Sequence, residues 1–211
     1  MNTAVEILAE KIVAASKTVG NRRLVIGIAG PPGSGKSTMA AALVAALKEQ
    51  QRPAVLLSMN GFYLANQLLE EKGLLFRKGV PESFDRFGFA SMLKAVRQDQ
   101  HEVFVPAFDS EHDLAIAAAL SIAPEDRIVI LEGSYLLLDE PGWREIRHML
   151  DITAFLAPPL GVLQERLVKR WRGYGLDAET AEKRVQENDL ANATRILEHR
   201  LRASLVFDAM D

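Results

Sequence analysis

The sequence predicts an α/β fold in which a mainly parallel β-sheet is covered by helices on both faces. Two observations predict it. Apolar runs of strand length alternate with longer segments that have helical spacing, and this alternation implies a parallel sheet. Residues 127–131 (RIVIL) form a continuous apolar run after the arginine, as is typical of a central strand buried on both faces.

The elements of the first half follow from these two patterns. Val5, Leu8 and Ile12 recur at helical spacing, so an amphipathic helix is expected to open the chain. An Ala/Leu-rich segment after the first strand indicates a second helix. In chain order we expect helix 4–17, strand 23–29, helix 38–48, strand 54–58, helix 64–72, a loop at 73–85, helix 87–98 and strand 102–106.

The second half continues the alternation. Its penultimate strand is stopped by Pro158 and Pro159, which lack the N–H that a sheet requires. In chain order we expect strand 127–131, helix 143–150, strand 151–156, helices 160–172, 178–187 and 190–199, and a last strand at 205–207. The chain has no internal repeat and no convincing linker, so residues 1–211 are expected to form a single domain.

Residues 30–37 (GPPGSGKS) match the pattern G-x-x-x-x-G-K-[ST] at every fixed position, between a predicted strand and a predicted helix. In such a loop, backbone N–H groups and the helix N-terminus converge on a polyphosphate. We expect Lys36 to reach the β- and γ-phosphates and the Ser37 hydroxyl to hold Mg²⁺. The residues expected to bind the nucleotide are Gly30, Gly33, Ser34, Gly35, Lys36, Ser37 and Thr38. The loop therefore predicts binding of a nucleoside triphosphate, with ATP and Mg²⁺ as the expected ligands.

Polar residues follow the other apolar runs. Asn60 comes after the second strand, Asp109 after the run at 102–106, and Glu132 after the central strand. Ligands of open parallel sheets bind outside the carboxyl ends of the strands, so these side chains are expected to gather around the triphosphate. Acidic residues at strand ends also form turns and cap helices. With a phosphate loop nearby, Glu132 is the leading candidate to organise Mg²⁺ through its waters.

The densest basic cluster lies at residues 166–172 (RLVKRWR). Arg166 and Arg170 are four residues apart and share a helix face. A solvated helix face is the simpler structural explanation, but phosphoryl transfer needs cations at the γ-phosphate. The neighbouring Gly173 and Gly175 supply the flexibility expected of a closing lid. We therefore expect residues of about 160–180 to form a lid that carries these two catalytic arginines.

The composition bears on the remaining classes of function. A net charge of −3 argues against nucleic acid as the main partner. The absence of cysteine excludes a disulfide, a thiolate metal site and a cysteine nucleophile. The first residues lack the positive region and apolar core of a signal peptide. The apolar stretch at 114–123 is far too short to span a bilayer. A cytoplasmic location with no membrane partner is the resulting expectation.

Six segments carry a resemblance to a known family. They lie at residues 30–38, 58–63, 77–85, 105–109, 131–138 and 188–193. Together they resemble the P-loop kinases of the uridine kinase, phosphoribulokinase and bacterial pantothenate kinase group. Within that group the chain is most similar to the nucleoside-kinase-like proteins labelled fructose transport system kinases. The phosphate loop alone specifies only a superfamily, whereas the ordered set of segments specifies the group.

The resemblance implies a P-loop NTPase fold with three α/β/α layers, a five-stranded, mainly parallel sheet and a helical lid. It implies transfer of the ATP γ-phosphate to a hydroxyl of a small-molecule acceptor. Acceptor binding is implied around Phe62, Tyr63, Asp85 and Asp109, and His112 follows Asp109 in the same loop. Relatives assemble into dimers or larger oligomers, so a homodimer is possible. Residue types do not choose between a sugar, a nucleoside and pantothenate as the acceptor.

The sequence departs from this family at Asn60, where most members have an aspartate that is thought to accept the proton of the attacking hydroxyl. An asparagine orients a hydroxyl through its carbonyl oxygen but cannot take its proton. Three interpretations follow. Asp85 or Asp109 acts as the base, the enzyme is slow, or the chain is an ATP-binding regulatory protein with weakened catalysis. A signalling GTPase is disfavoured, because the chain lacks an Asn-Lys-x-Asp motif.

Overall fold

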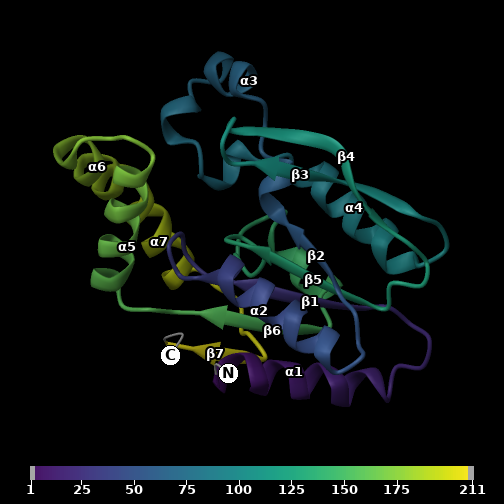
Figure 1. Cartoon of the computed structure of the whole chain (residues 1–211). Helices are drawn as coiled ribbons and strands as arrows, with labels where there is room; N and C mark the ends of the chain where they lie inside the picture. The colour runs from purple at the N-terminus through teal and green to yellow at the C-terminus, as the bar shows by residue number, and fades with distance from the viewer. Residues whose placement is uncertain (1–2, 209–211) are drawn as a thin grey trace.

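The computed structural model describes residues 3–208 and has a five-stranded sheet at its centre (Figure 1). Every pair of neighbouring strands in this sheet is parallel. The strands run in the order β2 (Val55–Ser58), β5 (Ile128–Gly133), β1 (Leu24–Ala29), β6 (Ile152–Leu156) and β7 (Leu205–Phe207). This arrangement confirms the predicted α/β fold with a five-stranded parallel sheet.

Two helical layers cover this sheet because alternate side chains of each strand point to opposite faces. Leu24, Ile26 and Ile28 of β1 pack in one core cluster with α1 (Thr3–Ser16) and α2 (Lys36–Glu49). Val25 and Ala29 belong to a second cluster on the other face. That face is covered by α4 (Arg86–Gln98), the 3₁₀ helix η4 (Arg144–Met149) and part of α7 (Leu190–Glu198).

A hairpin outside the sheet corrects one expectation. The run at 102–106 was expected to end at the ligand-binding edge of the parallel sheet, but β3 (Val103–Asp109) pairs antiparallel with β4 (Leu114–Ile122) in a separate two-stranded sheet. The apolar stretch at 114–123 is the second strand of this hairpin, and residues 114–121 are exposed. Apolar periodicity identifies a strand but not its partner, which depends here on the turn at 110–113.

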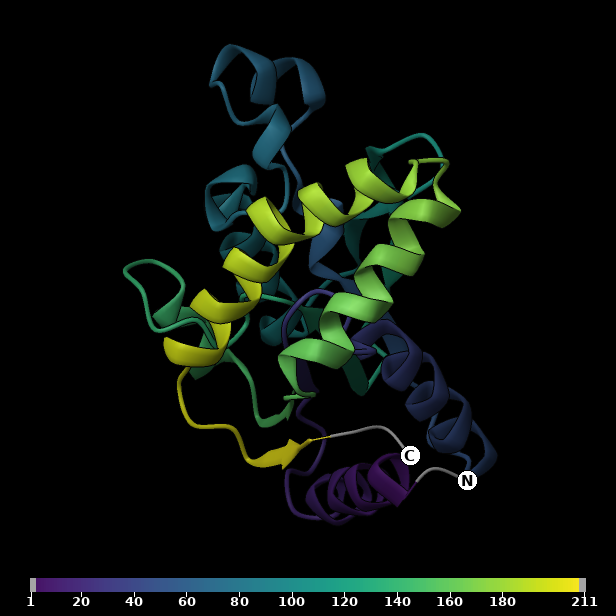
Figure 2. The ribbon, with the colours of Figure 1, turned by 90° about the vertical axis from the view of Figure 1, so that its left-hand side faces the viewer.

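The remaining elements lie beside the carboxyl ends of the strands. The segment between β2 and α4 contains η1 (Met59–Phe62), α3 (Asn66–Glu71), η2 (Leu75–Arg77) and η3 (Pro81–Ser83). On the other side, α5 (Leu160–Gly173) leads to a long helix that consists of α6 (Ala178–Arg184), a π-helical turn at Val185–Asp189 and α7 (Figure 2). None of the helices within residues 3–208 combines the length and apolar character needed to cross a membrane.

A buried arginine joins the sheet to its surroundings just before β1. The Arg23 side chain is fully buried and donates hydrogen bonds to the carbonyls of Val96, Ala123 and Asp126, at 2.5 to 2.7 Å. It also pairs with Asp99 at 2.9 Å. These contacts fasten the end of α4 and the loop after β4 to the start of β1.

Replacing Arg23 with methionine is expected to lower the free energy of unfolding by about 3 kcal/mol or more, because the buried acceptors lose their donor. The matched control is Arg22→Met, which removes a half-exposed arginine from a pair with Asp151 and should change stability by less than about 1 kcal/mol. Urea unfolding of both variants measures the difference. Equal losses would show that Arg23 has no special structural role.

Candidate active site

The phosphate loop lies between β1 and α2, as the sequence predicts. Gly30, Gly33 and Gly35 all have positive φ values, of 152°, 77° and 93°. A Cβ at Gly30 would lie 2.6 Å from the Leu156 carbonyl oxygen and 2.8 Å from Ser34 Oγ, so only glycine fits there. The loop is therefore a tight backbone turn that depends on its glycines.

The features of this loop fit a bound polyphosphate. Gly35, the N-cap residue of α2, has no side chain that could cap the helix. The first N–H groups of the helix are therefore available to an anion. Ser34 Oγ is buried and has no hydrogen-bond partner among residues 3–208. Ser37 and Thr38 are exposed and line a cavity beside the loop. The loop thus presents unpaired donors to phosphate oxygens.

Lys36 is the buried cation of the site. Its ammonium donates to the Pro31 carbonyl oxygen at 3.0 Å. Burial lowers the pKa of Lys36 to about 8, against the opposing effect of Glu132, and Arg170 lowers it further. A bound polyphosphate would raise this pKa, because negative charge favours the protonated form.

ATP binding is therefore expected to take up protons. At pH 8 the free protein carries Lys36 about half protonated, so saturation should take up about half a proton per site. Uptake should approach zero near pH 6.5, and above pH 8 ATP affinity should fall as pH rises. Titration calorimetry in two buffers of different ionisation enthalpy measures the uptake, and Lys36→Met should abolish it. A pH-independent affinity with no uptake at pH 8 would contradict this account.

A hydroxyl holds Glu132 at the carboxyl end of β5. Parallel pairing places Ser58 of β2 opposite Glu132, and Ser58 Oγ donates to Glu132 Oε1. Glu132 is 5% exposed and lines the same cavity as Lys36 and Ser37. This carboxylate is thus fixed beside the phosphate loop, where it could bind a hydrated Mg²⁺ together with the Ser37 hydroxyl.

Asn60 lies in η1, directly after β2. Its backbone N–H donates to Ser58 Oγ at 3.3 Å, so one serine positions both Asn60 and Glu132. Asn60 lines the cavity. The amide therefore occupies the place at the end of the second strand where the sequence predicted a catalytic group.

The two predicted lid arginines lie on α5 and face the phosphate loop. Arg166 Nη1 is 3.4 Å from the Gly33 carbonyl oxygen. The Arg170 guanidinium lies near the rings of Trp171 and Tyr174. Burial has the larger effect on both Lys36 and Tyr63: it lowers the pKa of Lys36 and raises that of Tyr63. The charge of Arg170 lowers both pKa values. Both arginines line the cavity, so the structure brings the lid cluster to the site.

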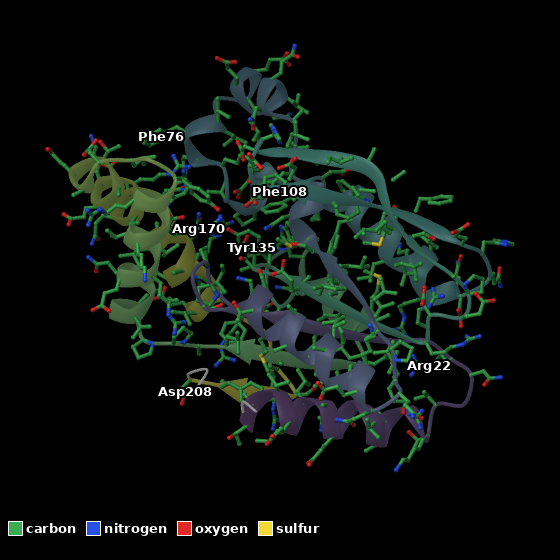
Figure 3. The ribbon with its side chains drawn as sticks, in the orientation of Figure 1. Arg22, Phe76, Phe108, Tyr135, Arg170 and Asp208 are labelled. Carbon is green, nitrogen blue, oxygen red and sulfur yellow. The ribbon has the colours of Figure 1, made fainter. Side chains whose placement is uncertain are left out.

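One cavity of about 980 Å³ joins the phosphate loop to the hairpin and to α5. Its far wall includes Tyr63, Phe108 and Lys78. Figure 3 labels two of its lining residues, Phe108 from β3 and Arg170 from α5. The volume is in the range of small-molecule sites, which are commonly about 300–1,000 Å³.

Four predicted substrate residues are not among the lining residues. Phe62 packs edge-to-face on Phe89 in the core. Asp85 is exposed and caps α4 by accepting from the Gly88 N–H at 2.8 Å. Asp109 accepts from the backbone N–H and ring of His112 in the hairpin turn, and these hydrogen bonds lower the pKa of Asp109. The expectation that Asp109 gathers at the sheet edge is not met, because it belongs to the separate hairpin.

Sequence patterns predict no individual binding or catalytic role for several residues that line the cavity. They are Trp171, Tyr174, Arg184, Asp189 and Asn192 from the helices α5 to α7, and Ser110, Glu111 and Asp113 from the hairpin turn. The segment at 188–193 was recognised only as part of a resemblance. Trp171 donates through Nε1 to Asp189 at 2.6 Å. Burial raises the pKa of Asp189 against the effect of this hydrogen bond.

The family model described as "Phosphoribulokinase / Uridine kinase family" matches residues 25–192. A protein of Schizosaccharomyces pombe with the proposed name of uridine kinase is 31% identical, over 99% of this chain and 88% of its own length. Pantothenate kinase of Coxiella burnetii is 32% identical over 70% of this chain, but this match spans only half of that enzyme.

Two solved structures are also similar to this chain. A protein of Silicibacter sp. TM1040 with the proposed name of fructose transport system kinase has a TM-score of 0.91 and 43% identity, over 96% of this chain and 98% of that one. A structure from Bacillus stearothermophilus described as a possible uridine kinase has a TM-score of 0.68 at 20% identity, which shows the shared fold alone.

Proposed function

Because the chain belongs to the phosphoribulokinase/uridine kinase family and is a small-molecule kinase, we propose that it transfers the γ-phosphate of ATP to a hydroxyl of an acceptor held in the cavity described above. One observation carries this proposal. The phosphate loop, Arg166 and Arg170 of α5, and an aromatic wall formed by Tyr63 and Phe108 all open into the same cavity. A site for ATP alone would not need that wall.

The side chains divide the work by position. Lys36 and the N-terminus of α2 hold the β- and γ-phosphates, and Ser37 with Glu132 would hold Mg²⁺. Mg²⁺ held there would supply positive charge that offsets the negative charge of the phosphates. Arg166 and Arg170 stabilise the charge on the transferred group. We assign these five side chains, with Asn60, to the chemical step, and residues of about 160–180 to a lid.

In the reaction the acceptor oxygen forms a bond to the γ-phosphorus while the bond to the β–γ bridging oxygen breaks, and ADP leaves with that electron pair. Asn60 orients the acceptor hydroxyl through its amide oxygen. Asp85 and Asp109, the two alternative bases, do not line the cavity. We therefore propose that the hydroxyl proton leaves without a carboxylate base, to the transferred phosphoryl group or to water, in a loose transition state that depends mainly on positioning.

A second candidate function rests on the same residue. Asn60 cannot remove a proton, so the chain could bind ATP as a regulatory protein with weakened catalysis. The two functions differ in turnover. Coupled ADP release with ATP and Mg²⁺ should be measured across fructose, uridine, pantothenate and related acceptors. Release stimulated by one acceptor would support the kinase, whereas ATP binding without stimulation by any acceptor would support the regulatory protein.

A further inference from the structure

A polar recess lies beside Gly79, on the acceptor side of the cavity. Gly79 has a φ of 114°, and the space at its missing Cβ is surrounded by three polar atoms. These are Asn192 Nδ2 at 3.8 Å, Asn188 Nδ2 at 3.9 Å and Tyr63 Oη at 4.0 Å from the position of that Cβ. Gly79, Tyr63 and Asn192 line the cavity, so the recess opens into it.

Two amide atoms of this recess are unsatisfied. Asn192 Nδ2 and Asn188 Oδ1 are buried without a hydrogen-bond partner among the described residues, and each asparagine is only 3% exposed. Asn188 Nδ2 is engaged, because it donates to the Lys78 carbonyl oxygen at 3.3 Å. Unpaired buried polar atoms are unfavourable, so their presence at a cavity wall points to a ligand that pairs with them.

The π-helical turn at Val185–Asp189 brings these asparagines to the cavity. It lies between α6 and α7, and Asn188, Asp189 and Asn192 are all buried around it. A π turn shifts the side chains that follow it around the helix axis, and such turns are frequent at functional sites. On the same turn, Gln186 and Glu187 are exposed. The helix therefore directs amides inward and leaves its solvent face polar.

Lys78, the residue before Gly79, is already neutralised. The three N–H donors of Lys78 have three acceptors, which are Asn66 Oδ1 at 2.7 Å, the Asp113 carbonyl oxygen at 3.1 Å and Asp113 Oδ1 at 2.9 Å. The ammonium also lies near the rings of Tyr63 and Phe108. Lys78 has no donor left for a substrate anion. An anion in the recess would instead face the lone pairs of Asn188 Oδ1, which has no donor among the described residues.

Burial raises the pKa of the Tyr63 hydroxyl well above its usual value, so this group stays protonated and can donate. In either orientation of its amide, an asparagine presents a donor or an acceptor to the recess. A hydroxyl group matches this set because it both donates and accepts, whereas a carboxylate only accepts.

We infer that Asn192, supported by Asn188 and Tyr63, binds a second, non-reacting hydroxyl of the acceptor, so that the acceptor is a neutral polyol. This inference rests on the proposed function, because it concerns the same cavity. The amide of Asn192 acts as a specificity-determining group at the end of the acceptor that is not phosphorylated. It sets the choice of acceptor rather than the rate of the chemical step.

The test measures acceptor binding separately from turnover. Calorimetry with a non-hydrolysable ATP analogue and Mg²⁺ present should compare fructose, sorbitol and uridine with their monodeoxy analogues and with gluconate. For the neutral compound that binds, removal of the matching hydroxyl should weaken binding by about 10- to 100-fold. Asn192→Leu should weaken binding of the intact compound by the same factor and should not weaken the deoxy analogue further. Turnover by Asn192→Leu should show a raised KM with little change in kcat.

The control variant is Gln186→Leu, which makes a similar amide-to-leucine change on the exposed face of the same turn and should bind like wild type. If Asn192→Leu does not fold, the nearly isosteric Asn192→Asp replaces the donor by an acceptor and should show the same loss. Equal binding by wild type and the Asn192 variants, preference for gluconate, or no binding of any neutral compound would overturn the inference. Binding that follows the predicted pattern without turnover would uphold it and would count against the proposed kinase activity alone.

Discussion

Replacing Lys36 with methionine is expected to lower kcat/KM by about 10³-fold, the largest effect expected of any substitution at this site. The methionine keeps the length of the side chain and removes its charge. Lys36 is the buried cation of the phosphate loop, and burial lowers its pKa to about 8. Little water is therefore present there to stabilise the phosphate charge once the ammonium is removed. The lost interaction is strongest when charge redistributes over the γ-phosphate, so kcat should fall more than ATP affinity.

The matched control is Lys48→Met, in the last turn of the same helix, where the lysine is exposed. That variant should retain wild-type turnover and stability. Steady-state kinetics on both variants, with circular dichroism to verify folding, makes the comparison. If the two substitutions had equal effects on turnover, Lys36 would have no role in phosphate binding or transfer.

Replacing Asn60 with aspartate is expected to raise kcat by about 10²-fold, the lower end of what a general base contributes. Asn60 lines the cavity next to the phosphate loop, whereas Asp85 caps α4 and Asp109 is bound to His112 in the hairpin turn. A carboxylate at residue 60 would follow β2 directly and line the cavity beside the phosphate loop. Turnover of Asn60→Asp should also fall at low pH as the new carboxyl group protonates, and the wild-type profile should lack this decrease.

The control here is Asn21→Asp, the same change at an exposed residue before β1. It should leave turnover unchanged. If Asn60→Asp were no faster than wild type, a proton acceptor would already be present in the cavity, or proton removal would not limit the rate. If it were inactive on every acceptor that wild type phosphorylates, Asn60 would have a role that its amide alone can serve.

The central sheet and the phosphate loop could be predicted because their signals are local. Leu24, Ile26 and Ile28 alternate with Val25 and Ala29 in the sequence itself, and the loop motif is contiguous. The hairpin could not be placed in this way. A strand-length apolar run has the same pattern whether it joins a parallel sheet or turns back on itself, and β3 is such a run.

The acceptor side of the cavity depends on tertiary structure. Asn192 and Tyr63 are more than a hundred residues apart, and only the packing of α7 against the segment around Gly79 brings them together. No motif marks an asparagine as buried, and the residues of the π turn that directs Asn188 inward follow no local sequence pattern that would reveal it. Asp85 and Asp109 are the opposite case, since they were candidates for the site but have structural roles. Asp85 caps α4, and Asp109 stabilises the hairpin turn.

Transfer of the terminal phosphoryl group can be followed directly with ATP labelled by ¹⁸O on the γ-phosphate. Wild-type protein with Mg²⁺ and the acceptor identified by ADP release should be analysed by mass spectrometry. The proposed function predicts a phosphorylated acceptor that carries the three labelled non-bridging oxygens, in an amount equal to the ADP formed. Label found only in inorganic phosphate, with no phosphorylated acceptor, would show hydrolysis in place of transfer and would contradict it.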